Sequence, residues 1–355
     1  MDRVRLGIIG CGDIAFRSYL PAIQELAERV VLVAACDTDR ARAERVKAEY
    51  GAEVALTDAD QMLARVALDG VLILTPMVPH GALSIAALEA GKHVYVEKVM
   101  AVNMGEADHM VTLAEDKGLT LACAPSTILL PAYQRTKALI DTGEIGRVCL
   151  VQAVGAHGGP ARWDGYTSDP TWFYRPGAGP LFDLAVYPVH ILTQILGPVK
   201  RVTAFSGLAV PELTMTAQAV RGQTLKVGVD DATPMVLDFG DATFATVHAG
   251  YNVLSVRLPA MEFWGSEGSL TAPAFSGDEI GLWHQGDAEW QVTHTEPTFY
   301  DRLGLAAGLP HWLDCICEGK PLVNHGRHGR HVLDVLLSAQ VSARESRAVE
   351  IGSTF

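Results

Sequence analysis

Apolar and polar positions in the first part of the chain alternate between two patterns. Short, mainly apolar runs predict strands buried on both faces, at residues 4–10, 30–37, 70–76, 93–98 and 119–125. Between them, amphipathic segments predict helices at residues 18–29, 38–51, 80–91 and 104–118. Strands and helices that alternate in this way indicate an α/β domain with a doubly wound parallel sheet, which we assign to residues 1–123.

The pattern changes after residue 123. One more helix is expected at residues 131–143, and β-rich runs separated by Gly, Pro and Asp then follow at residues 148–157, 199–207, 232–240, 242–252 and 260–272. Two helical stretches, residues 304–319 and 329–346, come last. We therefore expect residues 124–355 to form an α+β domain on an open, mainly antiparallel sheet.

Composition and charge narrow the class of protein. The chain has 355 residues, of which 49 % are hydrophobic and 19 % charged, enough to bury two cores. Its net charge of −13 argues against nucleic acid or anionic membrane surfaces as partners. No apolar run approaches the ~18 residues of a membrane span, and the N-terminus does not resemble a signal peptide. The spacing of the cysteines fits reduced thiols in a cytoplasmic protein.

A glycine-rich turn follows the first predicted strand, in the order Gly10, Cys11, Gly12, Asp13, Ile14 and Ala15. In this G-x-G-x-x-A pattern, Gly10 permits the tight turn and Gly12 lets backbone amides approach a pyrophosphate. Ala15 is small enough for the next helix to pack closely on the strand. Because the pattern joins a strand to a helix, it predicts a dinucleotide-binding Rossmann domain in which Asp13 and Ile14 also line the cofactor.

Asp37 lies at the end of the second predicted strand. A carboxylate at this position accepts hydrogen bonds from the ribose hydroxyls of NAD and repels the 2′-phosphate of NADP, so NAD is favoured as the cofactor. Arg40 and Arg42 follow closely and could instead attract a phosphate. We expect them to pair with acids on the surface of their own helix.

Glu97 and Lys98 interrupt an apolar run at the end of a predicted strand. They could mark a strand end that is simply solvated. However, ligands of open parallel sheets bind outside the carboxyl ends of the strands, which is where Lys98 lies. We therefore interpret Lys98 as part of a ligand site.

Several stretches together resemble the Gfo/Idh/MocA family of oxidoreductases, named for glucose–fructose oxidoreductase and inositol dehydrogenase. They cover most of the chain in order: residues 7–15, 35–39, 73–98, 139–148, 179–192 and 196–202. The combination is more specific than any single motif. The resemblance implies that the nicotinamide half of the site is bordered by Thr75, Pro76 and His80.

By the same resemblance, Glu97 and Lys98 correspond to the family's E-K-P signature at the nicotinamide. Val99 stands where the family usually has proline. The family's peptide bond at this point is often cis, whereas cis bonds are rare without proline. The backbone conformation after Lys98 is therefore open.

A second set of polar groups lies in the apolar stretch 179–192, where Asp183, Tyr187 and His190 are found. A carboxylate in such surroundings needs a partner. If the stretch is one helix, the three groups share a stripe, although Pro188 complicates a continuous helix. The alternative is a capped aspartate with a tyrosine and a histidine of the core.

The resemblance matches Asp183 to the aspartate of the family's D-x-x-x-H pattern and places Tyr187 where histidine is common. Alcohol oxidation needs a base that takes the hydroxyl proton, and a nearby cation favours the loss of that proton. We expect Tyr187 and Lys98 to form the proton-transfer pair, with Asp183 orienting Tyr187. His190 would orient the substrate or replace Tyr187 as the base.

A loop rich in Gly, Pro and Asp carries five aromatic residues: Trp163, Tyr166, Trp172, Phe173 and Tyr174. Arg162, Asp164 and Arg175 flank them. Aromatic faces beside charged groups suit a polyol, but a lid or a subunit contact is equally compatible. His157, just after a predicted strand, could also line the pocket, but we expect it to be an ordinary histidine at a strand end.

His325, His328 and His331 recur at every third position. Arginines lie between them, and no carboxylate or cysteine completes a ligand set, so we expect no metal.

Taken together, the sequence predicts an NAD-dependent dehydrogenase or reductase. Its substrate would be a secondary alcohol, or the matching ketone, of a sugar, cyclitol or related polyhydroxylated ring. The family resemblance implies a homodimer or homotetramer. Two alternatives are a catalytically silent NAD-binding sensor on the same fold and a reductase of a dihydrodiol, enone or imine.

Overall fold

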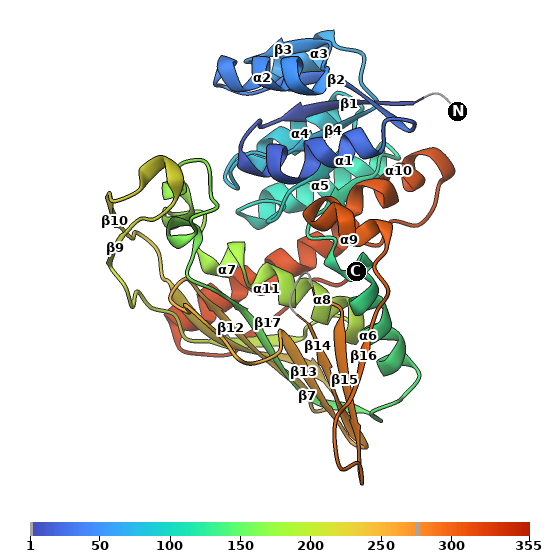
Figure 1. Cartoon of the computed structure of the whole chain (residues 1–355), viewed down its shortest axis with the longest axis vertical. Coiled ribbons are helices and arrows are strands. Elements are labelled where there is room, and N and C mark those ends of the chain that lie inside the picture. The colour runs from blue at the N-terminus through green and yellow to red at the C-terminus, as the bar shows by residue number, and fades with distance from the viewer. Residues whose placement is uncertain (1–2, 274–276) are drawn as a thin grey trace. The chain divides into compact units, whose positions relative to one another are not determined.

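The computed structural model of the chain describes residues 3–273 and 277–355. The chain divides into two compact units (Figure 1). The first comprises Met1–Ser126 and Leu305–Leu333, and the second comprises Thr127–Gly304 and Asp334–Phe355. The first unit thus takes in a C-terminal segment that a division of the sequence at residue 123 does not include.

The first unit contains a six-stranded sheet in the order β3-β2-β1-β4-β5-β6, and every pair of neighbouring strands is parallel. Its strands are β1 (Val4–Ile9), β2 (Val30–Cys36), β3 (Val54–Leu56), β4 (Gly70–Ile73), β5 (His93–Val96) and β6 (Leu121–Cys123). The order reverses between β1 and β4, which is the switch point where doubly wound sheets bind ligands. The predicted Rossmann fold is confirmed.

The apolar runs of the sequence explain why these strands form the buried centre of the first unit. The four residues of β4 are all buried, and so are Val94, Tyr95 and Val96 of β5. Strands covered on both faces need such apolar runs. The helices of the N-terminal segment are α1 (Leu20–Glu25), α2 (Arg40–Tyr50), α3 (Ala59–Arg65), α4 (His80–Glu89) and α5 (Met104–Asp116). A π-helical turn, η1 (Ala15–Tyr19), precedes α1.

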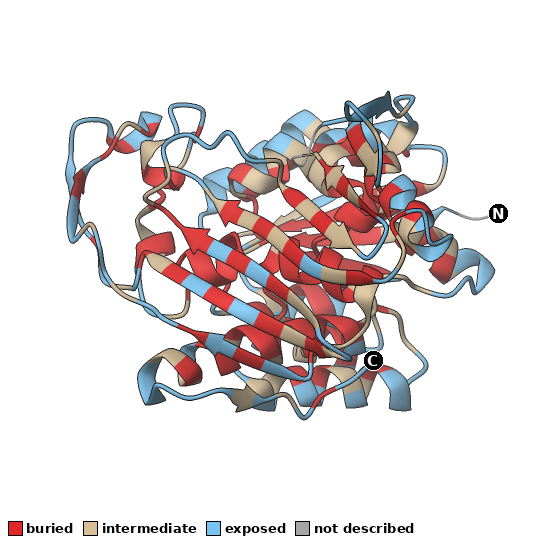
Figure 2. Cartoon of the chain, turned by 90° about the horizontal axis from the view of Figure 1, so that it is seen from below, coloured by how far each residue is buried: buried red, intermediate tan, exposed pale blue. Residues whose placement is uncertain are grey.

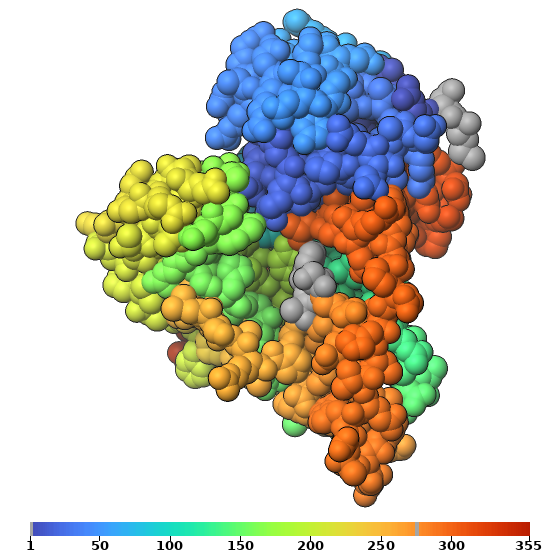
Figure 3. All heavy atoms as spheres, in the orientation of Figure 1, coloured from blue at the N-terminus to red at the C-terminus, as the bar shows by residue number. Residues whose placement is uncertain are grey.

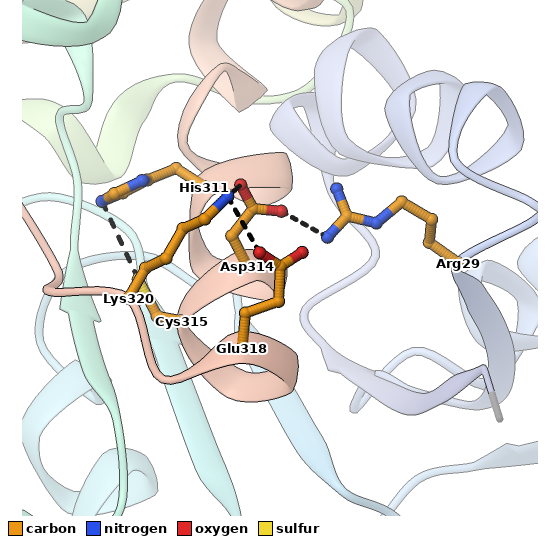
Figure 4. Close-up of polar contacts among 6 residues, drawn as sticks. All are labelled: Arg29, His311, Asp314, Cys315, Glu318 and Lys320. Atoms are coloured by element: carbon orange, nitrogen blue, oxygen red, sulfur yellow. Dashed lines mark hydrogen bonds and ion pairs between the residues drawn. The ribbon is translucent and has the colours of Figure 1, made fainter. Parts of the chain in front are cut away.

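Helix α10 (Gly308–Glu318) completes the first unit from the far end of the sequence. Figure 3 shows its segment, in orange, packed against the blue N-terminal residues. Asp314 accepts hydrogen bonds from Arg29 at 2.5 Å and Lys320 at 3.0 Å, and Glu318 pairs with Lys320 (Figure 4). The pair between Arg29 and Asp314 joins α10 to the residue that precedes β2.

The second unit is built on a nine-stranded sheet in the order β16-β15-β14-β13-β7-β12-β11-β8-β17. Only the β7–β12 pair is parallel among these described strands. The strands are β7 (Val148–Ala156), β8 (Arg201–Ala204), β11 (Ala232–Gly240), β12 (Thr243–Gly250), β13 (Met261–Gly265), β14 (Gly268–Ala272), β15 (Glu279–His284), β16 (Gln291–His294) and β17 (Val349–Glu350). The predicted open, mainly antiparallel sheet is confirmed.

One face of this sheet is covered by helices of the same unit. Contacts to the sheet come from α6 (Pro131–Asp141), α7 (Pro180–Asp183) and α8 (Val186–Leu196). Along the strands, buried residues alternate with more exposed ones, as the red and blue bands of Figure 2 show. The unit also contains a small hairpin of β9 (Glu212–Thr214) and β10 (Thr224–Lys226), and helix α9 (Phe299–Leu303). Helix α11 (Gly326–Glu345) begins in the first unit and ends in the second.

Two further sequence-based expectations concern helices and cysteines. Within residues 3–273 and 277–355, no helix combines the length and apolarity that a membrane span requires. All six cysteines are free, and four of them are buried.

Candidate active site

The glycine turn has the geometry that a bound pyrophosphate requires. Gly10 has φ +97°, and a Cβ there would lie 2.7 Å from backbone atoms of Leu74 and Thr75. Only glycine fits at such a position. A Cβ added to Gly12 would meet no atom within 4 Å, so its backbone faces open space, and Ala15 is fully buried. The turn therefore fits a dinucleotide.

Asp13 and Ile14 occupy the start of the helical segment that follows this turn. Asp13 is buried and forms an ion pair with Arg17, with Oδ2 2.9 Å from Nε. Ile14 is half-buried and has helical backbone angles. Both lie beside the turn as expected, and the carboxylate of Asp13 contacts Arg17, four residues further along the same segment.

Asp37 is fixed at the carboxyl end of β2. Its Oδ2 accepts a 2.8 Å hydrogen bond from the backbone amide of Cys11, and its Oδ1 accepts one of 2.9 Å from that of Asp39. The carboxylate is thus tied to the glycine turn. Arg40 pairs with Glu44 and Arg42 with Asp39. The expectation that both arginines pair with acids of their own helix is confirmed.

Glu97 is buried directly after β5, with 7 % of its surface exposed. The hydroxyl of Tyr19 donates a 2.7 Å hydrogen bond to its Oε1, and the backbone amide of Lys98 donates one of 3.0 Å to Oε2. A solvated strand end does not explain a carboxylate held in this way. Lys98 is half-buried, and the Lys98–Val99 peptide bond is cis without a proline.

His80 begins α4 and is fully buried. Its Nδ1 lies 2.7 Å from the carbonyl oxygen of Val99, and its Nε2 lies 2.8 Å from that of Thr75. Burial lowers the pKa of His80, while these two contacts and the charge of Glu97 act in the opposite direction. The ring therefore links the backbone after β4 to the backbone after β5. Thr75 is half-buried and Pro76 is exposed at the same sheet edge.

In the second unit, the stretch 179–192 is not one continuous helix. Helix α7 ends at Asp183 and α8 begins at Val186, with Pro188 in its first turn, where proline is tolerated. The expected stripe therefore holds only for Tyr187 and His190, which share α8. Tyr187 is half-buried and His190 is buried.

Asp183 has a partner that the sequence did not reveal. The hydroxyl of Tyr251, which directly follows β12, donates a 2.7 Å hydrogen bond to Oδ2 of Asp183. Both side chains are buried, and burial together with the charge of Asp183 raises the pKa of Tyr251 well above its ordinary value. The phenol therefore keeps its proton and remains a donor to the carboxylate.

The aromatic loop is a cluster of rings that pack mainly against one another. Trp172 stacks on Phe173 with centroids 3.6 Å apart, and Tyr166 meets Phe173 edge-on. Tyr174 is fully buried, 5.0 Å from Tyr251, and its hydroxyl accepts a hydrogen bond from the backbone of Ala161. Trp163, which is 43 % exposed, is the most accessible of the five.

The other histidines that the sequence analysis considered differ in burial. His157 is exposed, and its Nδ1 accepts a hydrogen bond from the backbone amide of Gly159. His325 lies at the end of the loop before α11, whereas His328 and His331 are buried in that helix. In the part of the chain that the structure describes, no three His, Cys, Asp or Glu residues are grouped so that they could hold a metal ion.

Comparison with known proteins identifies the family. Residues 4–124 match the model of an "Oxidoreductase family, NAD-binding Rossmann fold", and residues 133–271 match the "GFO/IDH/MocA C-terminal domain". A 3-reductase of dTDP-3,4-didehydro-2,6-dideoxy-alpha-D-glucose from Saccharopolyspora spinosa is 31 % identical over 291 residues, which cover 81 % of this chain and 78 % of that protein. The chain belongs to the Gfo/Idh/MocA family. It is an oxidoreductase with an NAD-binding Rossmann fold.

Other members of the Gfo/Idh/MocA family match over nearly the whole length. The scyllo-inositol 2-dehydrogenase (NAD(+)) of Bacillus subtilis is 27 % identical over 361 residues, covering 98 % of this chain and 96 % of that protein. A levoglucosan dehydrogenase solved with NADH and L-sorbose has a TM-score of 0.86 at 21 % identity, covering 99 % of this chain and 100 % of the other. At that identity the structural likeness shows the fold.

Proposed function

We propose that this oxidoreductase transfers a hydride between NAD(H) and a secondary alcohol or ketone of a polyhydroxylated ring. The observation that carries the proposal is the common location of the cofactor turn and Lys98. A Cβ at Gly10 would meet the backbone of Leu74 and Thr75, directly after β4, and Lys98 follows the adjacent strand β5. A cofactor on the glycine turn is thus bound at the sheet edge that carries the amine.

Residues of the first unit would hold the cofactor. The amides around Gly10 and Gly12 would bind the pyrophosphate, and Asp37 would bind the ribose hydroxyls. Thr75, Pro76 and His80 would border the nicotinamide, which supplies the hydride acceptor when NAD is bound. A carboxylate at Asp37 and the internal pairing of Arg40 and Arg42 support NAD over NADP.

Proton transfer falls to the chain's own side chains. When a secondary alcohol is oxidised, its carbon loses a hydride and its oxygen loses a proton. Tyr187 would take that proton, and the Lys98 ammonium would stabilise the oxygen as negative charge develops on it. Asp183, held by Tyr251, would orient this group, and His190 would orient the substrate or serve as the alternative base.

The relatives support a sugar or cyclitol as the substrate. Two groups of them are named for inositol 2-dehydrogenation and for 3-reduction of a dTDP-linked keto sugar. Both reactions interconvert a ring carbinol and a ring ketone. In the aromatic loop, the exposed Trp163 offers a face for the C–H side of such a ring.

A substrate screen tests the proposed function. Cyclitols, free sugars and a dTDP-linked keto sugar would be offered with NAD or NADP, or with the reduced forms, and nicotinamide absorbance would be followed. We expect turnover of at least one ring compound with NAD(H). NAD binding without turnover of any of them would support the silent sensor instead.

We also propose that the nine-stranded sheet pairs with a second copy of the chain through its more exposed face. Cross-strand partners on this face form a row of apolar side chains: Trp264 on β13 faces Leu150 on β7, which faces Phe244 on β12. Leu150 is 49 % exposed. A contiguous apolar row on an open sheet is typical of a subunit interface.

Light scattering tests this assembly. Leu150→Asp would place a charge in the row, and we expect it to lower the molar mass from that of an oligomer to that of a monomer. Val54→Asp, on strand β3 of the first unit, is the control because Val54 is also exposed but lies outside this sheet. A monomeric wild-type protein would refute the assembly.

A further inference from the structure

Arg162 lies at the end of a short turn in the aromatic loop of the second unit. The turn is the 3₁₀-helical segment η3 (Pro160–Arg162). The amide of Arg162 donates a 3.1 Å hydrogen bond to the carbonyl of Gly159, and the amide of Thr216 donates one of 2.8 Å to the carbonyl of Ala161. The backbone that carries the Arg162 side chain is therefore anchored both within the loop and to a distant segment of the same unit.

The guanidinium of Arg162 differs from those of comparable arginines in having no acid beside it. The other half-buried arginines in residues 3–273 and 277–355 each contact a carboxylate: Arg5, Arg29 and Arg330. Arg162 is half-buried too, yet its side chain makes no ion pair or hydrogen bond with any residue of those ranges. The nearest acid in the sequence, Asp164, pairs with Arg221 instead, with Oδ1 3.8 Å from Nη1. A charge that has lost part of its hydration without gaining a partner indicates a ligand of opposite charge.

The charge of Arg162 acts on the same phenol as the charge of Asp183. Tyr174 is fully buried, and its hydroxyl accepts a 3.1 Å hydrogen bond from the amide of Ala161. Burial raises the pKa of Tyr174 to about 12, and of the two charges Asp183 raises this pKa whereas Arg162 lowers it. The ring of Tyr174 also lies 5.0 Å from that of Tyr251, which donates to Asp183. Arg162 therefore belongs to the surroundings of the Asp183 carboxylate.

Apolar side chains lie beside Arg162. Trp163 follows it in the chain and is 43 % exposed, and Leu254 is 76 % exposed. A Cβ added to Gly158 would lie 3.3 Å from Cδ2 of Leu254 and 3.8 Å from the Cβ of Arg162, so both side chains adjoin Gly158. An indole, a leucine and a cation together suit a ring that has a C–H face and an anionic substituent.

We propose that Arg162 binds a negatively charged group, a carboxylate or a phosphate, on the ring substrate. The planar guanidinium can donate two parallel hydrogen bonds to two oxygens of either group. Such charge-assisted bonds are stronger than neutral ones, so they favour an anionic ring over a neutral one. A local cation is needed for this, because the chain as a whole carries a net charge of −13. The inference rests on the proposed function, since it takes the surroundings of Asp183 to be the place where the substrate binds.

Calorimetric binding of ring compounds to the full-length protein in the presence of NADH tests this inference. NADH already carries its hydride, so no alcohol is oxidised during the titration. Glucuronate and glucose 6-phosphate are compared with glucose, and myo-inositol 1-phosphate is compared with myo-inositol. We expect an anionic compound to bind at least about tenfold more tightly than its neutral parent. The compound that does so identifies the bound group as a carboxylate or a phosphate.

Variants of Arg162 assign the preference to this side chain. Arg162→Gln removes the charge, and we expect it to weaken binding of the anionic ring about 10- to 100-fold while binding of the neutral ring changes less than about twofold. Arg162→Lys keeps the charge without the paired donors, so its loss should be intermediate. Arg135→Gln, at an exposed position of α6 in the same unit, is the control for the loss of one positive charge. The unfolding temperature measures whether each variant is folded.

Equal affinity for anionic and neutral rings would overturn the inference, and so would an anionic preference that persists in Arg162→Gln. Turnover of neutral rings without any gain from an anionic group would leave the proposed function standing and remove the anion site. An Arg162-dependent preference in a protein that turns over no ring compound would refute the proposed function and retain the anion site.

Discussion

The hydroxyl of Tyr251 lies 2.7 Å from Oδ2 of Asp183 and joins the end of β12 to the end of α7. Asp183 is the residue that the family resemblance singles out, and it is buried. The carboxylate of Asp183 thus lies in the core of the second unit, where it accepts a hydrogen bond from a phenol that stays protonated. Substitutions at Tyr251 should therefore affect both stability and turnover.

Tyr251→Phe removes only the donor to Asp183. A buried carboxylate that loses a hydrogen bond costs about 1–3 kcal/mol of unfolding free energy. We also expect kcat to fall while the dissociation constant of NAD stays the same, because Tyr251 belongs to the second unit. Urea unfolding and steady-state kinetics measure the two effects, with Tyr300→Phe as a control. Equal losses of kcat and NAD affinity would contradict the assigned role.

His80 should be replaceable only by another hydrogen-bond donor. His80→Leu removes the contacts to the carbonyls of Thr75 and Val99, whereas the side-chain amide of Gln carries N–H bonds that can still donate to a carbonyl. We expect kcat to fall about tenfold or more in the Leu variant and less in the Gln variant. His109→Gln on the exposed face of α5 is the control. Equal activity of the Leu and Gln variants would rule out the linking role.

The first unit should lose stability in mildly acidic solution. Three of its histidines, His93, His311 and His325, each accept a backbone amide with a ring nitrogen, and burial lowers the pKa of each. Because the unfolded chain binds these protons more readily, unfolding becomes easier as pH falls through the unfolded value of about 6.5 towards the lowered folded values. The stabilisation is fully present above that window.

Thermal unfolding between pH 7.5 and pH 5 measures this effect. His311→Gln keeps a side-chain acceptor for the amide of Val323 but does not titrate, so it should flatten the pH dependence. A variant that depends on pH as steeply as the wild type would show that His311 does not contribute.

Asp37 should set the choice between NAD and NADP. Asp37→Ser removes the charge that would repel a 2′-phosphate, and we expect the ratio of kcat/KM for NAD to that for NADP to fall by about tenfold or more. Asp60→Asn, on the exposed start of α3, is the control. A wild-type preference for NADP would overturn the assignment before any variant is made.

The parts of the fold that could be predicted from sequence are those set by neighbouring residues. The apolar runs of β4 and β5 and the G-x-G-x-x-A turn are local signals, and each lies where the sequence places it. The hydrogen bonds of Tyr19 to Glu97 and of Tyr251 to Asp183 join residues 78 and 68 positions apart. No local pattern marks such partners, so the sequence suggested the acids and not the phenols that hold them.

Two features of the backbone also escaped prediction. Leu184 and Ala185 favour helix by themselves, yet they separate α7 from α8, so the break is not a matter of local propensity. Segment 305–333 belongs to the first unit because of long-range contacts, such as the backbone hydrogen bond from Cys123 to Asn324. Packing between distant segments therefore decides where segment 305–333 belongs.

The central claim is that the amine of Lys98 acts in hydride transfer at the carboxyl edge of the parallel sheet. The most direct measurement is a single turnover of NAD-loaded Lys98→Ala with a ring alcohol, followed by NADH fluorescence, with Lys47→Ala on the exposed face of α2 as the control. The account predicts a first-turnover rate lower by about 10²-fold or more, with NAD affinity within about threefold of the wild type. A first turnover as fast as that of the wild type would contradict it.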